Sequence, residues 1–118
     1  MLGEGTNRIF TIALALVNAR NNILLIDEID LGLHHSVQEK LWEIVFRFSK
    51  ELNVQVFATT HSQDCVQAFG EIWNKPENQK EGNYIRLQRN RLDSTLIEPV
   101  YYDSNVLLGS IYDNLEIR

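Results

Sequence analysis

Blocks of apolar and polar residues alternate along the chain, and their spacing predicts helices and strands in turn. From Thr6 to Arg20 the apolar residues recur every three or four positions, which is typical of an amphipathic helix preceded by the glycine-containing stretch Gly3 to Gly5. Asn21 and Asn22 interrupt this pattern. Residues 23–26 are then a continuous apolar run (Ile-Leu-Leu-Ile), which predicts an interior, parallel strand covered on both faces.

A second helix and strand follow in the same order. The residues from Val37 to about Leu52 carry an apolar stripe, with Ser36 as the expected N-terminal cap and Asn53 as the end of the helix. Val54 to Thr60 reads as the second strand. The order helix, strand, helix, strand is typical of a parallel α/β sheet with right-handed crossovers.

The pattern changes after the second strand. Ser62 is the expected cap of a third helix, which ends in a polar loop from Asn74 to Gly82. The strand-like segments Tyr84 to Arg89 and Thr95 to Tyr102 predict an antiparallel hairpin. Ser104 to Leu115 predicts a final helix. The sequence therefore predicts an α/β fold that closes with a hairpin and a helix.

Size and charge narrow the range of functions. A chain of 118 residues with 44% hydrophobic and 23% charged residues can form one compact domain with a real core. The net charge of -5 argues against broad binding to nucleic acids or acidic membranes. The single Cys65 excludes an internal disulfide, and no apolar run approaches the ~20 residues of a membrane span. A reduced cytoplasm is the expected compartment.

Both predicted strands end in residues that can do chemistry. Asp27 and Glu28 follow the first strand, and His61 follows the second. Ligands gather at the carboxyl ends of parallel strands, and neighbouring strands are about 4.8 Å apart, so these residues are expected to share one rim. Because strand side chains alternate, Asp27 and Glu28 would point in different directions, so that one carboxylate would bind a metal ion and the other would act on an attacking water. The His61 imidazole would donate a hydrogen bond to the negative charge that develops in the reaction.

Four motifs occur in a fixed order: Leu2-Gly3-Glu4-Gly5-Thr6, Ile23 to Glu28, Asp30-Leu31-Gly32-Leu33-His34 and Thr59-Thr60-His61-Ser62. They resemble the signature motif, Walker B, D-loop and switch-histidine segment of ABC-type ATPases. The chain thus resembles the C-terminal half of such an ATPase domain, in the AAA-type P-loop branch of overcoming-lysogenization-defect proteins and chromosome-maintenance and recombination ATPases. The resemblance covers nearly the whole chain. It implies a partial P-loop NTPase fold of three layers, with parallel strands flanked by helices.

The resemblance also implies roles, ligands and partners. Asp27 would hold Mg²⁺ through water, Glu28 would be the catalytic base and His61 the switch residue. The signature residues would contact the γ-phosphate of ATP bound to a second subunit through backbone N–H groups and a helix N-terminus. The ATP-binding residues implied by the signature and the D-loop are Gly3, Glu4, Gly5, Thr6, Asp30 and His34. Gly3 stands where the family usually has Ser, and His34 where it usually has Asp.

The phosphate-binding loop of this family is absent from the sequence. None of the six glycines begins a G-x-x-x-x-G-K-[ST] pattern. Residues 1–118 are therefore expected to be a single domain, the C-terminal portion of an ATP-binding cassette without the Walker A strand and loop. We expect a fragment, a truncated reading frame or one half of a split ATPase. Its expected partner is a second copy or a P-loop-containing subunit in an ATP-dependent dimer, with DNA or a nuclease effector reached through that partner.

Two other functions remain open at this point. The first is a non-catalytic interaction or dimerisation module derived from such an ATPase. The second is a magnesium-dependent nuclease resembling a topoisomerase-primase site, built from Asp27, Glu28 and Asp30. That fold would need a further glutamate at a strand end, whereas Glu4 precedes a helix.

Several other residues have a plain structural interpretation beside a functional one. His34 and His35 fit a helix entry better than a metal site, because no third ligand stands at a suitable spacing. Cys65 fits a small apolar packing residue. Three arginines on the hairpin could contact a nucleic-acid backbone, but charges on an exposed hairpin more often protect its edge: Arg86, Arg89 and Arg91.

Overall fold

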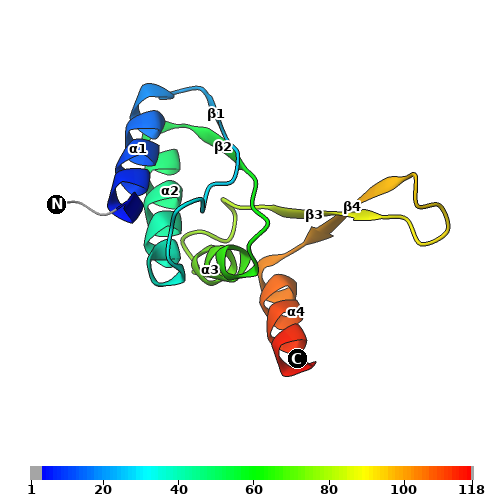
Figure 1. Ribbon diagram of the computed structural model, residues 1–118. Coiled ribbons are helices and arrows are strands. Elements are labelled where there is room, and N and C mark those ends of the chain that lie inside the picture. Colours follow the sequence, from blue (N-terminus) through cyan, green and yellow to red (C-terminus); the bar gives the residue numbers. More distant parts are fainter. Residues whose placement is uncertain (1–3, 118) are drawn as a thin grey trace. The chain divides into compact units, whose positions relative to one another are not determined.

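The computed structural model describes residues 4–117, which form helices and short strands (Figure 1). Their contacts divide the chain into two units, Met1–Ile72 and Trp73–Arg118, and we describe each unit by itself. Unit 1 contains α1 (Glu4–Asn18), β1 (Ile23–Ile26), the 3-10 helix η1 (His35–Val37), α2 (Gln38–Leu52), β2 (Gln55–Ala58) and nearly all of α3 (Gln63–Trp73). Unit 2 contains β3 (Tyr84–Arg89), β4 (Ile97–Tyr102) and α4 (Ser104–Ile117).

Unit 1 is built on two parallel strands joined through α2. β1 pairs with β2 in a register that runs from Ile23 opposite Gln55 to Ile26 opposite Ala58. The predicted parallel pairing is therefore confirmed, and β1 has the predicted bounds, while β2 is shorter than the predicted strand. α1 packs beside α2 (Figure 1). The result is a mixed α/β arrangement with a small parallel sheet, compatible with part of a P-loop NTPase fold.

The prediction that the first strand is covered on both faces is wrong for the described residues. Exposure alternates along β1: Leu24 and Ile26 are half-buried, whereas Ile23 is 60% and Leu25 75% exposed. Phe57 of β2 is also 53% exposed. A continuous apolar run indicates that its side chains favour burial. In β1, however, no described element covers the face that carries Ile23 and Leu25.

The core of unit 1 lies between its helices. Side chains that are almost fully buried come from all three helices and from the segment after β1: Ile12, Leu16, Ile29, Leu41, Val45, Phe46, Cys65 and Ile72. Trp42 joins them, because its indole Nε1 donates a hydrogen bond of 3.1 Å to the Cys65 carbonyl oxygen and its ring meets Phe69 edge-on at 4.9 Å. The interpretation of Cys65 as a small apolar packing residue is confirmed.

The ends of the first two helices differ in part from the sequence prediction. α1 already begins at Glu4, so Gly5 lies inside its first turn rather than before it. Ser36 does not cap α2, because η1 is inserted there, and the His34 ring accepts the Ser36 N–H instead. Asn53 ends α2 as predicted, in the left-handed conformation (φ 54°, ψ 53°) that Asn tolerates better than most residues.

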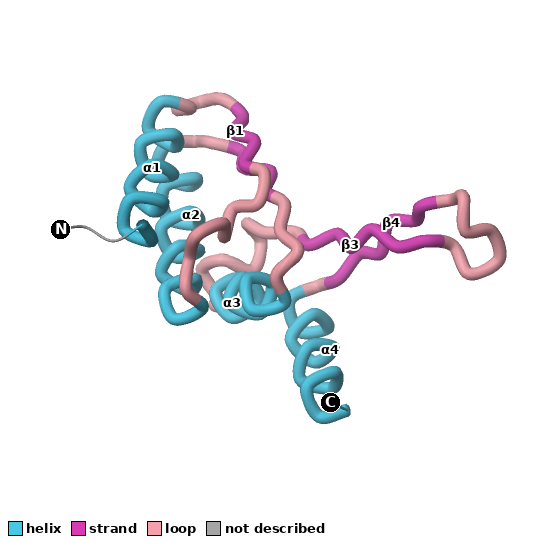
Figure 2. The backbone as a smooth tube through the Cα atoms, in the orientation of Figure 1, coloured by secondary structure: helices cyan, strands magenta, loops and turns pink. Residues whose placement is uncertain are grey.

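Unit 2 contains the predicted hairpin and final helix. β3 and β4 pair antiparallel, from Tyr84 opposite Tyr102 to Arg89 opposite Ile97 (Figure 2). Arg89 donates from Nη1 to the Ser94 carbonyl oxygen at 2.8 Å, so this arginine holds the turn. Asp103 caps α4 by accepting the Val106 N–H at 2.8 Å. Within residues 4–117, no helix combines the length and the apolar character needed to cross a membrane.

Candidate functional site

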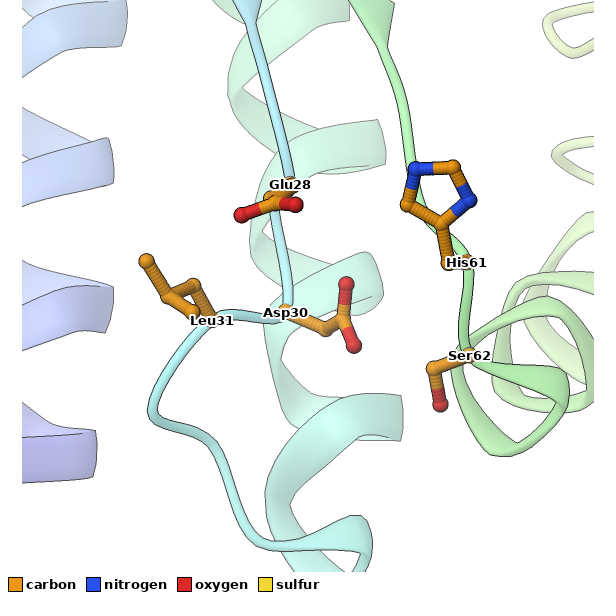
Figure 3. A pocket seen from close by; sticks show the side chains of 5 residues that line it. All are labelled: Glu28, Asp30, Leu31, His61 and Ser62. Carbon is orange, nitrogen blue, oxygen red and sulfur yellow. The ribbon is translucent and has the colours of Figure 1, made fainter.

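Residues that follow β1 and β2 surround one open cavity of about 320 Å³. Glu28, Asp30 and Leu31 come from the segment after β1, and His61 and Ser62 from the segment after β2 (Figure 3). The two segments are brought together by the parallel pairing, because the carboxyl ends of parallel strands lie at the same edge of a sheet. The sequence predicts that Asp27, Glu28 and His61 share one rim. Glu28 and His61 do line this cavity, whereas Asp27 is not among its lining residues.

Glu28 leaves the strand in a left-handed backbone conformation, with φ of 49°. The strand itself ends at Ile26, so the expectation that Asp27 and Glu28 diverge by strand alternation is wrong: both residues lie in a turn. The Glu28 N–H donates to Thr59 Oγ1 at 2.9 Å, and its carbonyl oxygen accepts from Arg8 Nη2 at 3.0 Å. Side chains from two other segments therefore bind both backbone polar groups of Glu28.

The two consecutive threonines after β2 make equivalent bridges to the acidic segment. Thr59 Oγ1 donates to Asp27 Oδ1 and accepts from the Glu28 N–H. Thr60 Oγ1 donates to Asp30 Oδ1 at 2.6 Å and accepts from the Ser62 N–H at 3.0 Å. Figure 3 shows Asp30 projecting toward the segment that carries Ser62. Each hydroxyl therefore stands between a backbone N–H and an aspartate carboxylate.

Sequence reasoning missed Arg8 and gave Thr59 no contact of its own. Arg8 projects from α1, and its Nε lies 3.5 Å from the Ile29 carbonyl oxygen in addition to its bond to Glu28. The one signal for Arg8 in the sequence is that Arg8 and Arg20 are the only Lys or Arg residues before Lys40.

The signature residues are only partly described. Gly3 lies outside the described residues, as does the side chain of Glu4, while Gly5 and Thr6 belong to the first turn of α1. A Cβ atom at Gly5 would lie 3.5 Å from Leu33 Cδ2, so the start of α1 is adjacent to the segment that resembles the D-loop.

The remaining D-loop candidate has a structural role. The His34 Nδ1 atom lies 2.9 Å from Ser36 Oγ at the start of η1. Gly5, Thr6 and His34 do not line the cavity. The helix-entry interpretation of His34 is confirmed.

The acidic groups suit a cation that is mainly held by other ligands. Glu28 and Asp30 line the cavity, and Asp27 precedes Glu28 in the same turn. One oxygen each of Asp27 and Asp30 already accepts a threonine hydrogen bond. Among the described residues, no group of three or more His, Cys, Asp or Glu side chains is placed to hold a metal ion. Mg²⁺ commonly binds through one or two carboxylates together with water and phosphate oxygens. The donor set fits that mode, and the described residues do not form the carboxylate cluster of the nuclease alternative.

Comparison with known proteins identifies the family. Residues 1–64, more than half of the chain, match the family described as "AAA domain, putative AbiEii toxin, Type IV TA system". The chain belongs to this AAA family and contains part of a P-loop ATPase-like domain.

Two relatives extend the comparison. An "ATP/GTP phosphatase" of Helicobacter pylori is 27% identical over 109 residues, which are 90% of this chain and 29% of that protein. An uncharacterized protein of Methanocaldococcus jannaschii is 34% identical over 88 residues, which are 75% of each chain. The chain thus spans less than a third of the first relative and three quarters of the second.

Proposed function

We propose that residues 1–118 supply the Walker B, signature and switch-histidine part of an ABC-type ATPase in the overcoming-lysogenization-defect branch. The observation that carries the proposal is the cavity at the carboxyl ends of β1 and β2, where Glu28, Asp30 and His61 meet. Membership of the AAA family and the "ATP/GTP phosphatase" name of the H. pylori relative support nucleotide hydrolysis as the reaction. The wider three-layer sheet of such ATPases is part of the proposal.

The proposed roles follow from the chemistry of each side chain. Glu28 accepts the proton of the attacking water, because its carboxylate lines the cavity. His61 donates to the transferred phosphate, where a hydrogen bond stabilises the developing charge. Asp27 orients the water shell of a magnesium ion with its carboxylate. When bound, Mg²⁺ neutralises charge on the β- and γ-phosphates, which an acid-rich rim would otherwise repel.

The α- and β-phosphates need a P-loop from outside residues 1–118, since no G-x-x-x-x-G-K-[ST] pattern occurs in the chain. We propose that another segment or a partner subunit supplies that loop, and that the signature residues Gly3 to Thr6 face ATP across an ATP-dependent dimer. The position of Gly5 in the first turn of α1, beside Leu33, supports a joint role of the signature and D-loop segments. Asp30 and His34 belong to that D-loop segment. DNA or a nuclease effector would act through the partner.

The decisive experiment is the substitution Glu28→Gln in the assembly that contains both these residues and the P-loop. Loss of a general base lowers turnover by about 10²- to 10⁴-fold, while ATP binding persists because the phosphate contacts remain. The measurements are the ATP hydrolysis rate and the amount of ATP retained by the complex after gel filtration. The matched control is Glu39→Gln on α2, an exposed glutamate away from the cavity, which leaves both quantities unchanged.

Equal hydrolysis by Glu28→Gln and Glu39→Gln would reject the proposal and favour the interaction module. A second contradiction would come from the chain alone. Tight ATP binding by residues 1–118 without a P-loop, measured by calorimetry, would show that the nucleotide is held by groups other than those proposed.

A further inference from the structure

Thr59 binds four consecutive residues of the turn that carries Glu28. Its N–H donates to the Ile26 carbonyl oxygen and its carbonyl oxygen accepts from the Ile29 N–H, both at 3.0 Å. Its hydroxyl donates to Asp27 Oδ1 and accepts from the Glu28 N–H. The bonds to Ile26 and Ile29 are made by the Thr59 main chain and need no particular side chain. The bonds to Asp27 and Glu28 depend on the Thr59 hydroxyl.

The direction of the hydroxyl is set by its chemistry. A threonine hydroxyl has one proton and two lone pairs. The Asp27 carboxylate can only accept and the Glu28 N–H can only donate, so the proton must point to Asp27 and a lone pair to Glu28. The charge on Asp27 therefore fixes the orientation that holds the Glu28 backbone.

Arg8 holds the other side of the same peptide segment. Its guanidinium lies at the Glu28 carbonyl oxygen, 3.0 Å away, and reaches the Ile29 carbonyl oxygen. A non-glycine residue at φ of 49° is held against a local preference of roughly 1 kcal/mol, so it needs such external contacts. The Leu31 N–H also donates to the Glu28 carbonyl oxygen at 3.0 Å, so Arg8 adds a second donor to that oxygen. Loss of the Thr59 and Arg8 contacts would leave the Glu28 backbone held by main-chain bonds alone.

We propose that Thr59 and Arg8 are positioning residues for Glu28: together they lock its left-handed backbone and so aim its carboxylate into the cavity. The inference rests on the proposed function for its catalytic consequence, but the lock itself can be measured without turnover. It also links α1, through Arg8, to the turn that bears Glu28 and, through Thr59, to the β2 end that bears His61.

The first test compares Thr59→Val with Thr59→Ser in the 118-residue chain. Valine keeps the shape and both backbone bonds but loses the hydroxyl, so the Glu28 amide exchanges about tenfold faster or more in hydrogen-exchange NMR. The Ile29 amide stays protected, because its acceptor is the main-chain oxygen of residue 59. Thr59→Ser restores the protection of Glu28. The matched control is Thr95→Val, which removes an exposed threonine bound to Asp93 in the hairpin turn.

The second test measures ATP turnover in the assembly that contains the P-loop. In Thr59→Val the misplaced Glu28 lowers kcat by roughly 10- to 100-fold. The KM for ATP stays within about twofold of the parent value, because a base acts on the transition state rather than on nucleotide binding. Thr59→Ser recovers most of kcat. Arg8→Gln lowers kcat in the same way, and Arg20→Gln, an exposed arginine just after α1, does not.

The outcomes separate the two proposals. Unchanged Glu28 exchange in Thr59→Val, or a Thr59→Ser variant as impaired as Thr59→Val, overturns the positioning role. So does normal kcat in Thr59→Val when Glu28→Gln is inactive, which would leave the proposed function intact. If the parent assembly hydrolyses no ATP, the proposed function fails, while the amide exchange still decides whether Thr59 holds Glu28.

Discussion

At the scale of single residues, burial alters the chemistry of the Cys65 thiol. Its side chain is 0% exposed, and burial raises the pKa of the thiol from 9.0 to about 11. A thiolate is the reactive form of cysteine, so a thiol kept protonated by burial is poorly nucleophilic near neutral pH. Cys65 therefore acts in the folded protein as a packing residue beside Trp42.

The raised pKa of Cys65 predicts a loss of stability in alkali. Above pH 9 the thiol ionises in the unfolded chain but not in the folded one, so the free energy of unfolding falls as pH rises from about 9 to 11. The contribution is at most about 1.4 kcal/mol per pH unit in that window. Urea unfolding at pH 8, 9 and 10 measures it, and Cys65→Ala removes this part of the slope. Parallel pH profiles for the parent and Cys65→Ala would contradict the assignment.

Some residues of the site were predictable from the sequence and others were not. Glu28 and His61 could be placed together, because parallel strands deliver whatever follows them to one edge, but the same reasoning also placed Asp27 there, and Asp27 does not line the cavity. The left-handed φ of Glu28 could not be predicted, since it depends on Arg8 and Thr59, which are 20 and 31 positions away. Periodicity carries no information about such side-chain to backbone bonds. The roles given to the site residues remain predictions.

At the scale of secondary-structure elements, close packing around Gly82 in unit 2 leaves no room for a larger side chain at this position. A Cβ atom at Gly82 would lie 2.7 Å from Cδ1 of the buried Trp73 ring, whose Nε1 donates to the Gln79 carbonyl oxygen. The indole cannot move without loss of that bond. The loop from Asn74 to Gly82 is therefore fitted to Trp73.

Two glycine-to-alanine substitutions test this packing. Gly82→Ala lowers the free energy of unfolding by about 1 to 3 kcal/mol, because overpacking forces the ring away. Gly109→Ala in α4 raises it by about 0.5 to 1 kcal/mol, because its Cβ meets nothing within 4 Å and alanine favours a helix. Urea denaturation of both variants gives the comparison. Equal changes in the free energy of unfolding for the two variants would show that the Trp73 ring can move aside at no cost.

The elements themselves were largely predictable. The bounds of β1 follow from an apolar run between polar neighbours, and Asn53 ends α2 as expected. The cap of α3 was also correct, because Ser62 Oγ accepts the Cys65 N–H at 3.2 Å. The expected Ser36 cap of α2 was wrong because η1 is inserted there, and a single 3-10 turn has no periodicity to detect.

At the scale of the whole molecule, the apolar residues fall into two groups: those buried in the core and those exposed on one face of the small sheet. Leu16 of α1 is 0% exposed, whereas Leu25 of β1 is 75% exposed. The sequence gives no sign of this difference, because both stand in apolar runs. What covers a strand depends on elements outside that strand, and exposed apolar clusters are common where another surface binds.

Substitutions at these two leucines have very different expected costs. Leu16→Ala lowers the free energy of unfolding by about 2 to 5 kcal/mol, because it leaves a cavity in the core. Leu25→Thr changes it by at most about 0.5 kcal/mol, because the side chain is already in water and threonine suits a strand. Chemical denaturation of the chain measures both. A large cost for Leu25→Thr would mean that this face is covered in the 118-residue chain itself.

The left-handed backbone at Glu28 also has an evolutionary consequence. Glycine and asparagine adopt this conformation at less cost than glutamate, so local folding alone would favour them at position 28. Glutamate would persist there only under selection for its carboxylate. Under the proposed role of Glu28, natural relatives with glycine or asparagine at this position would be expected to have lost the general base.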